Sequence, residues 1–325
     1  LLRQWHARII ENAEPLAQLI TLECGKPLAE ARGEVAYAAS FVEWFAEEAK
    51  RVYGDTIPGP TPDRRIIVLK QPVGVTAAIT PWNFPNAMIT RKVAPGLAAG
   101  CTMVIKPSDF TPYSALALGV LAERAGIPAG VLNILTGRPE AIGSALTASP
   151  VVRKLSFTGS TRVGALLAEQ CAPTLKKMSL ELGGNDAGIV LPDADPAAIA
   201  EGLFWGAFIN NGQTCAALKR LYVHDSIHDA VCAALVAFAR TIPLGDGMDE
   251  ASVLGPVQNR AQFDKVAALV ADAAGAHRID SPIVNEGGGF IAGRVMKAGQ
   301  DMAPTITEAV VAGLAPVLAE ARDAA

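Results

Sequence analysis

The feature that most constrains this chain is a repeated alternation of short apolar strands with helices, which begins after Gly74. Repeated strand–helix units of this length predict a parallel sheet covered by helices on both faces, so the fold class that we expect is α/β. In such sheets, ligands bind at the carboxyl ends of the strands. The strands predicted from the apolar runs are residues 75–79, 102–105, 131–135, 154–157 and 178–180.

The segments on either side of this pattern carry weaker signals. Residues 1–49 have apolar positions at helical spacing, interrupted at 24–27, and this spacing predicts helices. The stretch 54–62 is rich in Gly and Pro and indicates a turn, whereas residues 66–69 predict a short strand. A hinge-like turn at 181–184 precedes a second α/β region.

Composition excludes several classes of function. Half of the residues are hydrophobic and 18% are charged, so the chain can bury a large core. The net charge of −4 comes without a basic cluster, which argues against nucleic-acid binding. The longest apolar run, 93–105, is too short to span a bilayer and contains Pro95, so we expect no membrane partner.

The five cysteines are scattered, odd in number and without a C-x-x-C pair. This pattern argues against a disulfide framework or a zinc site and favours a reducing compartment. No signal-peptide pattern opens the chain, and we expect a cytoplasmic protein. The chain begins with Leu1 rather than Met, so we expect a fragment or a processed form.

Polar side chains follow the predicted strands, at the edge where ligands bind. Asn83 lies in a rigid loop after the strand at 75–79, and its amide could donate to a developing oxyanion. Glu181 follows the strand at 178–180 and precedes two glycines, so its carboxylate could activate water. The alternative interpretations are structural: a turn residue before a helix for Asn83, and a salt bridge at a strand end for Glu181.

Residues 159–164 resemble a phosphate loop, because Gly159 lets the backbone approach a ligand and a helix N-terminus favours an anion. The spacing is not G-x-G-x-x-G, so an ordinary strand–helix turn is an equal interpretation. Lys106 and Asp109 could hydrogen-bond ribose hydroxyls, and a carboxylate there would repel a 2′-phosphate. Their alternative is a solvated helix start, where the charge of Asp109 is favourable.

A polar loop, residues 210–216, follows an apolar run and carries Cys215. A reactive nucleophile and an incidental buried thiol are equal interpretations of this loop taken alone. His224 and His228 are spaced i, i+4, but the sequence around them is typical of a strand end and a helix cap. Because no third ligand completes a set, we expect no metal site.

Five motifs occur together in the chain, and their intervals include 23 residues from Asn83 to Lys106 and 34 from Glu181 to Cys215. With these motifs the chain resembles the NAD(P)-dependent aldehyde dehydrogenase superfamily. The resemblance implies a Rossmann-type parallel-sheet cofactor domain and a second, incomplete α/β catalytic domain. The motifs are T-P-W-N-F-P at 80–85, I-K-P-S at 105–108, F-T-G-S-T at 157–161, E-L-G-G at 181–184 and N-G-Q-T-C at 211–215.

The resemblance implies oxidation of an aldehyde to a carboxylic acid. By resemblance, the Cys215 thiolate would attack the aldehyde carbonyl, and the Asn83 amide with the Cys215 N–H would hold the oxyanion of the thiohemiacetal. Hydride transfer to the nicotinamide would leave a thioester, and Glu181 would activate the water that hydrolyses it. The expected small-molecule partner is therefore an aldehyde.

The resemblance also implies the residues that bind the cofactor, NAD with NADP as an alternative. Lys106 and Asp109 would contact the adenosine ribose, Ser160 the pyrophosphate, and Trp82 would line the passage shared with the substrate. The Asp109 carboxylate favours NAD. The neighbouring motif positions expected to bind the cofactor are Ser108, Gly137 and Gly159.

Residues 54–126 look most like succinate-semialdehyde dehydrogenases, which hold the distal substrate carboxylate with arginines. Arg91 matches one of these arginines, and Ile209 stands where the second would lie, six residues before the nucleophile. A bidentate carboxylate clamp needs Arg at that position. Ala217 stands at the second position of the Cys-x-Cys redox pair found in some of these enzymes. Succinate semialdehyde is therefore a leading candidate substrate only.

The chain departs from the family pattern at both ends, and we expect it to be shortened there. The family's E-x-F-G-P motif is reduced to a trace in which Gly313 falls at the Glu position. The alternative to an active enzyme is therefore a shortened relative that only binds NAD(P), or a non-functional fragment. We expect a dinucleotide-binding domain at 1–55 and 71–180, a strand-turn segment for homo-oligomerisation at 56–70, a catalytic domain at 181–290 and a divergent tail at 291–325.

Overall fold

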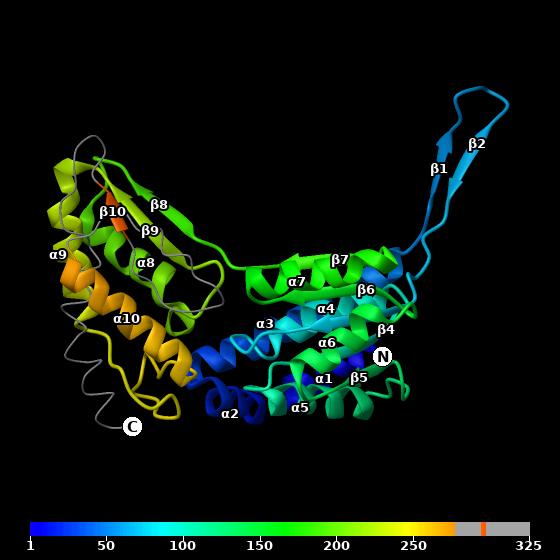
Figure 1. Ribbon diagram of the computed structural model, residues 1–325, viewed down its shortest axis with the longest axis horizontal. Coiled ribbons are helices and arrows are strands. Elements are labelled where there is room, and N and C mark those ends of the chain that lie inside the picture. The colour runs from blue at the N-terminus through cyan, green and yellow to red at the C-terminus, as the bar shows by residue number, and fades with distance from the viewer. Residues whose placement is uncertain (277–293, 297–325) are drawn as a thin grey trace. The chain divides into compact units, whose positions relative to one another are not determined.

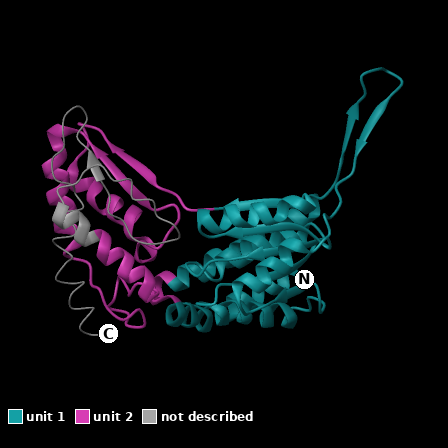
Figure 2. Cartoon of the chain, viewed as in Figure 1, with its two compact units in different colours: residues 1–23, 31–181 teal, residues 24–30, 182–325 magenta. Residues whose placement is uncertain are grey.

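The computed structural model describes residues 1–276 and 294–296. The chain divides into two compact units, which are described separately (Figure 2). Unit 1 comprises Leu1–Glu23 and Ala31–Glu181, and unit 2 comprises Cys24–Glu30 and the chain from Leu182 onward. The turn predicted at 181–184 is therefore the point at which the chain leaves unit 1. The predicted tail, 291–325, and the trace of the E-x-F-G-P motif lie outside the described residues, apart from 294–296.

Helices open the chain, as their apolar spacing predicts. Trp5 and Ile9 lie one turn apart on the first helix and are fully buried. The indole N–H of Trp5 donates to the carbonyl of Leu118 at 3.1 Å, which joins this helix to α5 (Pro112–Arg124). The predicted break is present, and Gly25 has a φ of +78° there. These helices are α1 (Leu2–Glu11), α2 (Ala13–Cys24) and α3 (Leu28–Glu48), followed by the short η1 (Ala49–Arg51).

A five-stranded parallel sheet forms the centre of unit 1, in the order β5-β4-β3-β6-β7. Figure 1 shows this sheet among the helices of unit 1. The predicted parallel sheet is thus confirmed. The central strand β3 pairs on both sides, so that Ala77 lies opposite Val104 and Leu155. Ala77 and Leu155 are fully buried, as expected for a strand covered on both faces. The strands are β3 (Val75–Ile79), β4 (Thr102–Lys106), β5 (Leu132–Ile134), β6 (Val152–Thr158) and β7 (Lys177–Glu181).

Helices connect these strands, as the predicted strand–helix alternation requires. Pro112 opens α5, where its missing N–H costs no hydrogen bond. The helices are α4 (Ala87–Ala98), α5 (Pro112–Arg124), α6 (Pro139–Ala148) and α7 (Thr161–Cys171), and the short η2 (Ala172–Thr174) precedes β7.

A two-stranded antiparallel hairpin precedes the sheet of unit 1. Its strands are β1 (Asp55–Pro58) and β2 (Arg65–Val68). The prediction of a turn over 54–62 was therefore wrong for residues 55–58, although the strand predicted at 66–69 is present. Every residue of both strands is exposed. Because neither strand buries an apolar face, β1 lacks the alternating pattern by which a strand is recognised.

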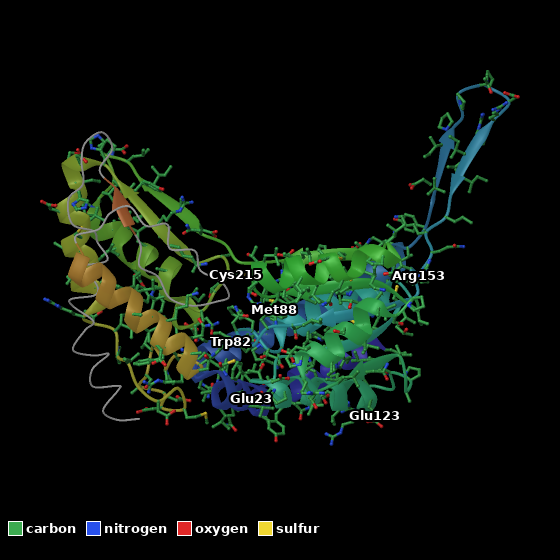
Figure 3. All side chains as sticks on the ribbon, in the orientation of Figure 1. Glu23, Trp82, Met88, Glu123, Arg153 and Cys215 are labelled. Carbon is green, nitrogen blue, oxygen red and sulfur yellow. The ribbon has the colours of Figure 1, made fainter. Side chains whose placement is uncertain are left out.

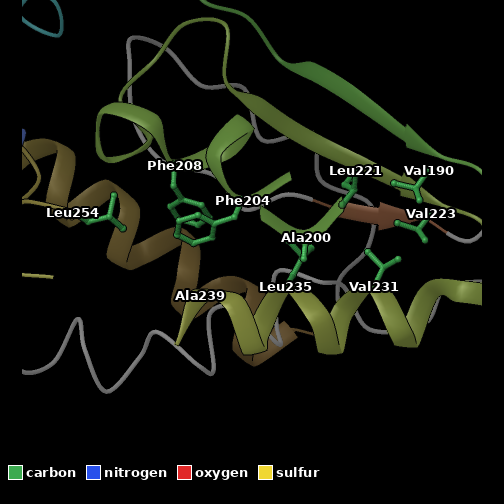
Figure 4. Close-up of a cluster of buried hydrophobic side chains, with 10 residues drawn as sticks. All are labelled: Val190, Ala200, Phe204, Phe208, Leu221, Val223, Val231, Leu235, Ala239 and Leu254. Carbon is green, nitrogen blue, oxygen red and sulfur yellow. The ribbon is translucent and has the colours of Figure 1, made fainter. Parts of the chain in front are cut away.

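Unit 2 is also α/β, with a three-stranded parallel sheet in the order β10-β9-β8. Phe204 and Phe208 stack with ring centroids 4.6 Å apart in its core, which also contains Leu221 and Val231 (Figure 4). The elements are β8 (Asp186–Val190), α8 (Pro196–Phe208), η3 (Ile209–Gly212), β9 (Leu218–Val223), η4 (Asp225–Ile227), α9 (His228–Ala239), α10 (Arg260–Ala276) and β10 (Arg294–Met296). Among the described residues, no helix combines the length and apolar character needed to cross a membrane.

Candidate active site

The carboxyl ends of the five parallel strands meet at one edge of the sheet of unit 1. Each strand leads into one or more of the residues that the sequence singled out. Backbone hydrogen bonds continue beyond the strands: Thr80 N–H donates to Lys106 at 3.1 Å, and Gly159 N–H to Glu181 at 3.0 Å. Lys106 and Glu181 are the last residues of β4 and β7. The other predicted residues follow the strands: Trp82 and Asn83 after β3, Ser108 and Asp109 after β4, Gly137 after β5, and Gly159 and Ser160 after β6.

The loop after β3 carries Trp82, which is labelled in Figure 3. The next residue, Asn83, is only 7% exposed. The loop is fixed at its far end by Glu34 of α3. One carboxylate oxygen of Glu34 accepts from the N–H groups of Asn86 and Ala87 at 2.9 and 3.2 Å. These groups lie at the start of α4, where a negative charge is favourable. A buried amide on such a fixed loop can donate to an oxyanion without reorganisation.

The end of β4 places a buried ammonium beside a half-exposed carboxylate. Lys106 is 4% exposed, and its Nζ forms an ion pair and hydrogen bond with Asp109. Ser108 orders the turn between them, because its Oγ accepts from the N–H of Phe110 at 3.3 Å. Together the three side chains offer both donors and acceptors, which suits the hydroxyl groups of a sugar.

The end of β6 forms a turn into α7 that suits a phosphate. Ser160 caps α7, and its Oγ accepts from the N–H of Val163 at 3.3 Å. A Cβ at Gly159 would lie 2.5 Å from the Phe157 ring, so this close approach requires glycine. The first N–H groups of an eleven-residue helix attract an anion at the ligand-binding edge of the sheet. Gly137, after β5, adopts a φ of +134° that other residues rarely adopt.

Arg91, the predicted substrate residue, lies on α4. Its guanidinium carbon is 5.2 Å from the centroid of the Phe41 ring, a cation–π distance. Its Nη1 lies 3.9 Å from the sulfur of Met88, one turn earlier on the helix. These contacts position the guanidinium on unit 1 and leave it exposed.

Lys92, the residue after Arg91, is a candidate functional residue that the sequence analysis missed. It is 8% exposed, and its Nζ donates to Ser156 Oγ at 3.1 Å. Burial is the main cause that lowers the pKa of Lys92 to about 8; the charge of Arg91 adds to this effect, and that of Glu181 opposes it. The signal in the sequence was a lysine in a helical stretch with apolar residues at 87–89 and 93–94, and the structure buries all of these positions.

The loop that carries Cys215 belongs to unit 2 and begins with two strained residues. Asn210 and Asn211 have φ values of 56° and 55°, a left-handed conformation that Asn tolerates better than most residues. Glu30 accepts from the N–H of Asn210 at 2.8 Å, and the Asn211 side chain accepts from Gly255 N–H at 2.8 Å. Backbone strain held by such contacts is frequent at active sites.

Residues 210–216, named the nucleophile loop for the role predicted for Cys215, lie against the linker at residues 182–184, where the chain enters unit 2. A Cβ at Gly184 would lie 2.8 Å from the Cys215 carbonyl oxygen, so the close approach of the two backbones requires glycine. Two other cysteines, Cys171 and Cys232, have surroundings that disfavour a reactive thiol. Burial raises the pKa of the Cys171 thiol and raises that of Cys232 to about 12, which disfavours a thiolate at both positions.

His224 and His228 have structural surroundings. The Nδ1 of His224 accepts from the Ser226 N–H at 3.3 Å and caps η4 directly after β9, as the sequence predicted. His228 is 3% exposed, and its Nδ1 lies 2.8 Å from an Asp229 oxygen. Within residues 1–276 and 294–296, no group of three or more potential ligands could hold a metal ion.

Unit 1 thus brings the predicted amide, ammonium, helix N-terminus and carboxylate to one sheet edge, and unit 2 presents a cysteine on a strained, hydrogen-bonded loop. This fold and these residues define an α/β protein with a parallel sheet and polar groups gathered at its carboxyl edge. The chain matches the aldehyde dehydrogenase family over residues 1–316. It therefore belongs to the aldehyde dehydrogenase family.

Similar proteins extend this comparison. The chain is 54% identical over 305 residues to a glutarate-semialdehyde dehydrogenase of Pseudomonas putida (strain KT2440), covering 94% of this chain and 62% of that protein. It is 57% identical over 273 residues to the NADP(+) succinate-semialdehyde dehydrogenase GabD of Escherichia coli (strain K12), covering 84% of this chain and 57% of that protein. The chain thus spans about three fifths of the length of these relatives.

A solved structure confirms the predicted aldehyde dehydrogenase-like fold. An aldehyde dehydrogenase from Brucella melitensis biovar abortus 2308 is 58% identical, with a TM-score of 0.82. The match covers 84% of this chain and 56% of that one.

The lowered pKa of Lys92 predicts a pH-dependent stability. Burial, Arg91 and Lys154 lower this pKa from 10.5 to about 8 in the folded chain. Between these values the unfolded chain binds more protons at Lys92, so folding becomes more favourable as pH rises. From pH 7.5 to 9.5, wild type should gain on the order of 2 kcal/mol of unfolding free energy relative to Lys92→Met, measured by urea denaturation. A difference that does not change with pH would contradict this assignment.

Proposed function

We propose that this chain carries the nucleophile and the NAD(P)-binding edge of an enzyme that oxidises aldehydes to carboxylic acids. The observation that carries the proposal is the nucleophile loop itself. Two left-handed asparagines hold the backbone that precedes Cys215, and such strain persists only when the surroundings impose it. Membership of the aldehyde dehydrogenase family and the polar groups at the sheet edge of unit 1 support the same reaction.

The residues at the sheet edge fit NAD(P). The N-terminus of α7 with Gly159 and Ser160 would hold the pyrophosphate, and Lys106, Ser108 and Asp109 would bind the adenosine ribose. Trp82 and Gly137 would line the same edge. When bound, the nicotinamide supplies the hydride acceptor for the oxidation. The Asp109 carboxylate favours NAD, although one relative is named for NADP(+).

In the proposed reaction, the Cys215 thiolate adds to the aldehyde carbon and forms a thiohemiacetal. The Asn83 amide and the Cys215 N–H donate to the oxyanion. Loss of hydride converts the adduct into a thioester. Glu181 then takes a proton from water, which attacks the thioester carbon, releases the carboxylic acid and restores the thiol.

Replacing the nucleophile tests the proposed function. Cys215→Ala should lower aldehyde-dependent NADH formation by on the order of 10⁴-fold or more, because no thiohemiacetal can form. NAD(P) binding, followed by fluorescence titration, should remain. Cys232→Ala is the matched control, because its pKa of about 12 disfavours a thiolate, and it should retain wild-type activity.

The opposite result identifies the alternative function. Folded wild-type protein that binds NAD(P) but oxidises none of a panel of aldehydes would be a binding protein rather than an enzyme. Loss of activity in Cys232→Ala as well as Cys215→Ala would remove the assignment of the nucleophile to Cys215.

We propose a substrate with an anionic group distant from the aldehyde. Two relatives are named for glutarate semialdehyde and succinate semialdehyde, both of which carry a carboxylate. Arg91 supplies an exposed guanidinium that can bind such a group. Ile209 stands six residues before Cys215, at the position where the family resemblance places the second arginine, and it is 47% exposed.

A second arginine should therefore improve the use of an anionic aldehyde. Ile209→Arg should raise the ratio of kcat/KM for succinate semialdehyde over butanal by about tenfold, the effect of one charged hydrogen bond. Ile209→Gln is the neutral control and should leave the ratio unchanged. The ratio is measured by steady-state NADH formation, and an equal ratio in wild type and Ile209→Arg would contradict the clamp.

We further propose that the β1–β2 hairpin mediates self-association, as expected for residues 56–70. Tyr53, Ile67 and Leu69 are 66%, 70% and 73% exposed, and the hairpin has open backbone edges. Apolar side chains and strand edges of this kind mark protein interfaces.

Charges on the hairpin should disrupt the assembly. Wild type should have an oligomeric mass in multi-angle light scattering, and Ile67→Glu with Leu69→Glu should lower it, because burying carboxylates opposes association. Leu22→Glu, at a residue 71% exposed on α2, is the control and should keep the wild-type mass. A monomeric wild type would contradict the proposal.

A further inference from the structure

Lys219 is a buried lysine on β9, four residues after Cys215, to which the sequence analysis assigned no role. It is 5% exposed. Its Nζ lies 2.8 Å from the carbonyl oxygen of Cys215, 3.2 Å from that of Thr214 and 3.2 Å from that of Gly184. An ammonium group has three donors, so these three carbonyls account for all of them. The three acceptors lie on the nucleophile loop and on the linker beside it.

Burying the ammonium group of Lys219 costs free energy, because burial disfavours the charged form. Burial is the main cause that lowers the pKa of Lys219, and the charges of Asp186 and Cys215 oppose this shift. Gly184 is also required to be glycine here, because a Cβ would lie 2.8 Å from the Cys215 oxygen and 3.0 Å from Asp186 Oδ1. The Lys219 ammonium, the Asp186 carboxylate and the close backbone approach at Gly184 therefore all lie near the peptide groups of the nucleophile loop.

The contact with Thr214 has a chemical consequence for the next residue. The Thr214 carbonyl and the Cys215 N–H belong to one planar trans peptide, so fixing the carbonyl also fixes the direction of the N–H. A charged donor on the carbonyl oxygen polarises the peptide and strengthens its N–H as a donor. In the proposed function, this N–H is one of two donors to the oxyanion.

We propose that Lys219 is a positioning residue that orients and polarises the Thr214–Cys215 peptide, so that the Cys215 N–H stabilises the oxyanion of the thiohemiacetal. The inference rests on the proposed function, because it assigns Lys219 a role in the step that Cys215 begins. Lys219 itself touches neither substrate nor cofactor in this role. It acts through the backbone of the nucleophile loop.

Kinetics test the catalytic consequence. Lys219→Met should lower kcat/KM for the aldehyde about tenfold to a hundredfold, somewhat less than complete removal of an oxyanion donor, with the KM for NAD(P) unchanged. Lys219→Arg keeps the charge and should recover part of the loss. Lys176→Met is the matched control: Lys176 is 8% exposed on unit 1 and donates to the carbonyls of Ser149 and Val152, and its replacement should leave kcat/KM within about threefold of wild type.

Nuclear magnetic resonance tests the contact without any turnover. Cys215 is the only cysteine that follows a threonine, so labelling Thr carbonyls with ¹³C and Cys amides with ¹⁵N gives one doubly labelled peptide. Its carbonyl resonance should move upfield in Lys219→Met, because the hydrogen bond to Thr214 is lost, and should stay in place in Lys176→Met.

The two measurements separate the possible failures. A carbonyl resonance that does not move in Lys219→Met overturns the contact, and a moved resonance with unchanged kcat/KM overturns the positioning role. Wild-type protein without aldehyde-dependent NADH formation overturns the proposed function and with it any catalytic role of Lys219. In that case a moved resonance identifies a purely structural contact.

Discussion

The hydrogen bonding of β3 with β4 and β6 is the interaction on which the rest of unit 1 depends. Parallel pairing places all carboxyl ends at one edge, so residues distant in the sequence reach the same place. Without this register, Lys106 and Glu181 would be surface residues with no common environment. The sheet itself follows from simple physical chemistry, because short runs of small and β-branched residues bury well on both faces when helices cover them.

In unit 2, the feature of interest is the loop that holds Cys215, the proposed nucleophile. The loop is fixed by contacts that its own sequence does not suggest: Glu30 and Gly255 bind the two left-handed asparagines, and Lys219 binds the carbonyls of Thr214 and Cys215. The contacts of Glu30 and Gly255 reach the loop from positions 180 and 44 residues away in the sequence. Such pre-organisation stabilises a transition state more than it stabilises the bound substrate.

The sequence predicted the elements well where burial and period agree, and less well where an element or a role depends on distant partners. The strands of unit 1 have apolar runs bounded by turn residues, so their positions follow from local pattern. Strand β1 has no buried face and exists through its pairing with β2, so its Gly- and Pro-rich surroundings indicated a turn instead. Lys92 and Lys219 were missed for a related reason: a lysine is expected at the surface, and only the tertiary structure shows that both are buried.

The central claim is that Cys215 forms a covalent thioester during aldehyde oxidation, and mass spectrometry tests it most directly. The chain with Glu181→Gln, which lacks the proposed base, is mixed with NAD and an aldehyde, quenched in acid and digested. The account predicts that the peptide containing Cys215 gains the mass of the acyl group, and only when NAD is present. Absence of the adduct, or an adduct on another cysteine, would contradict the account.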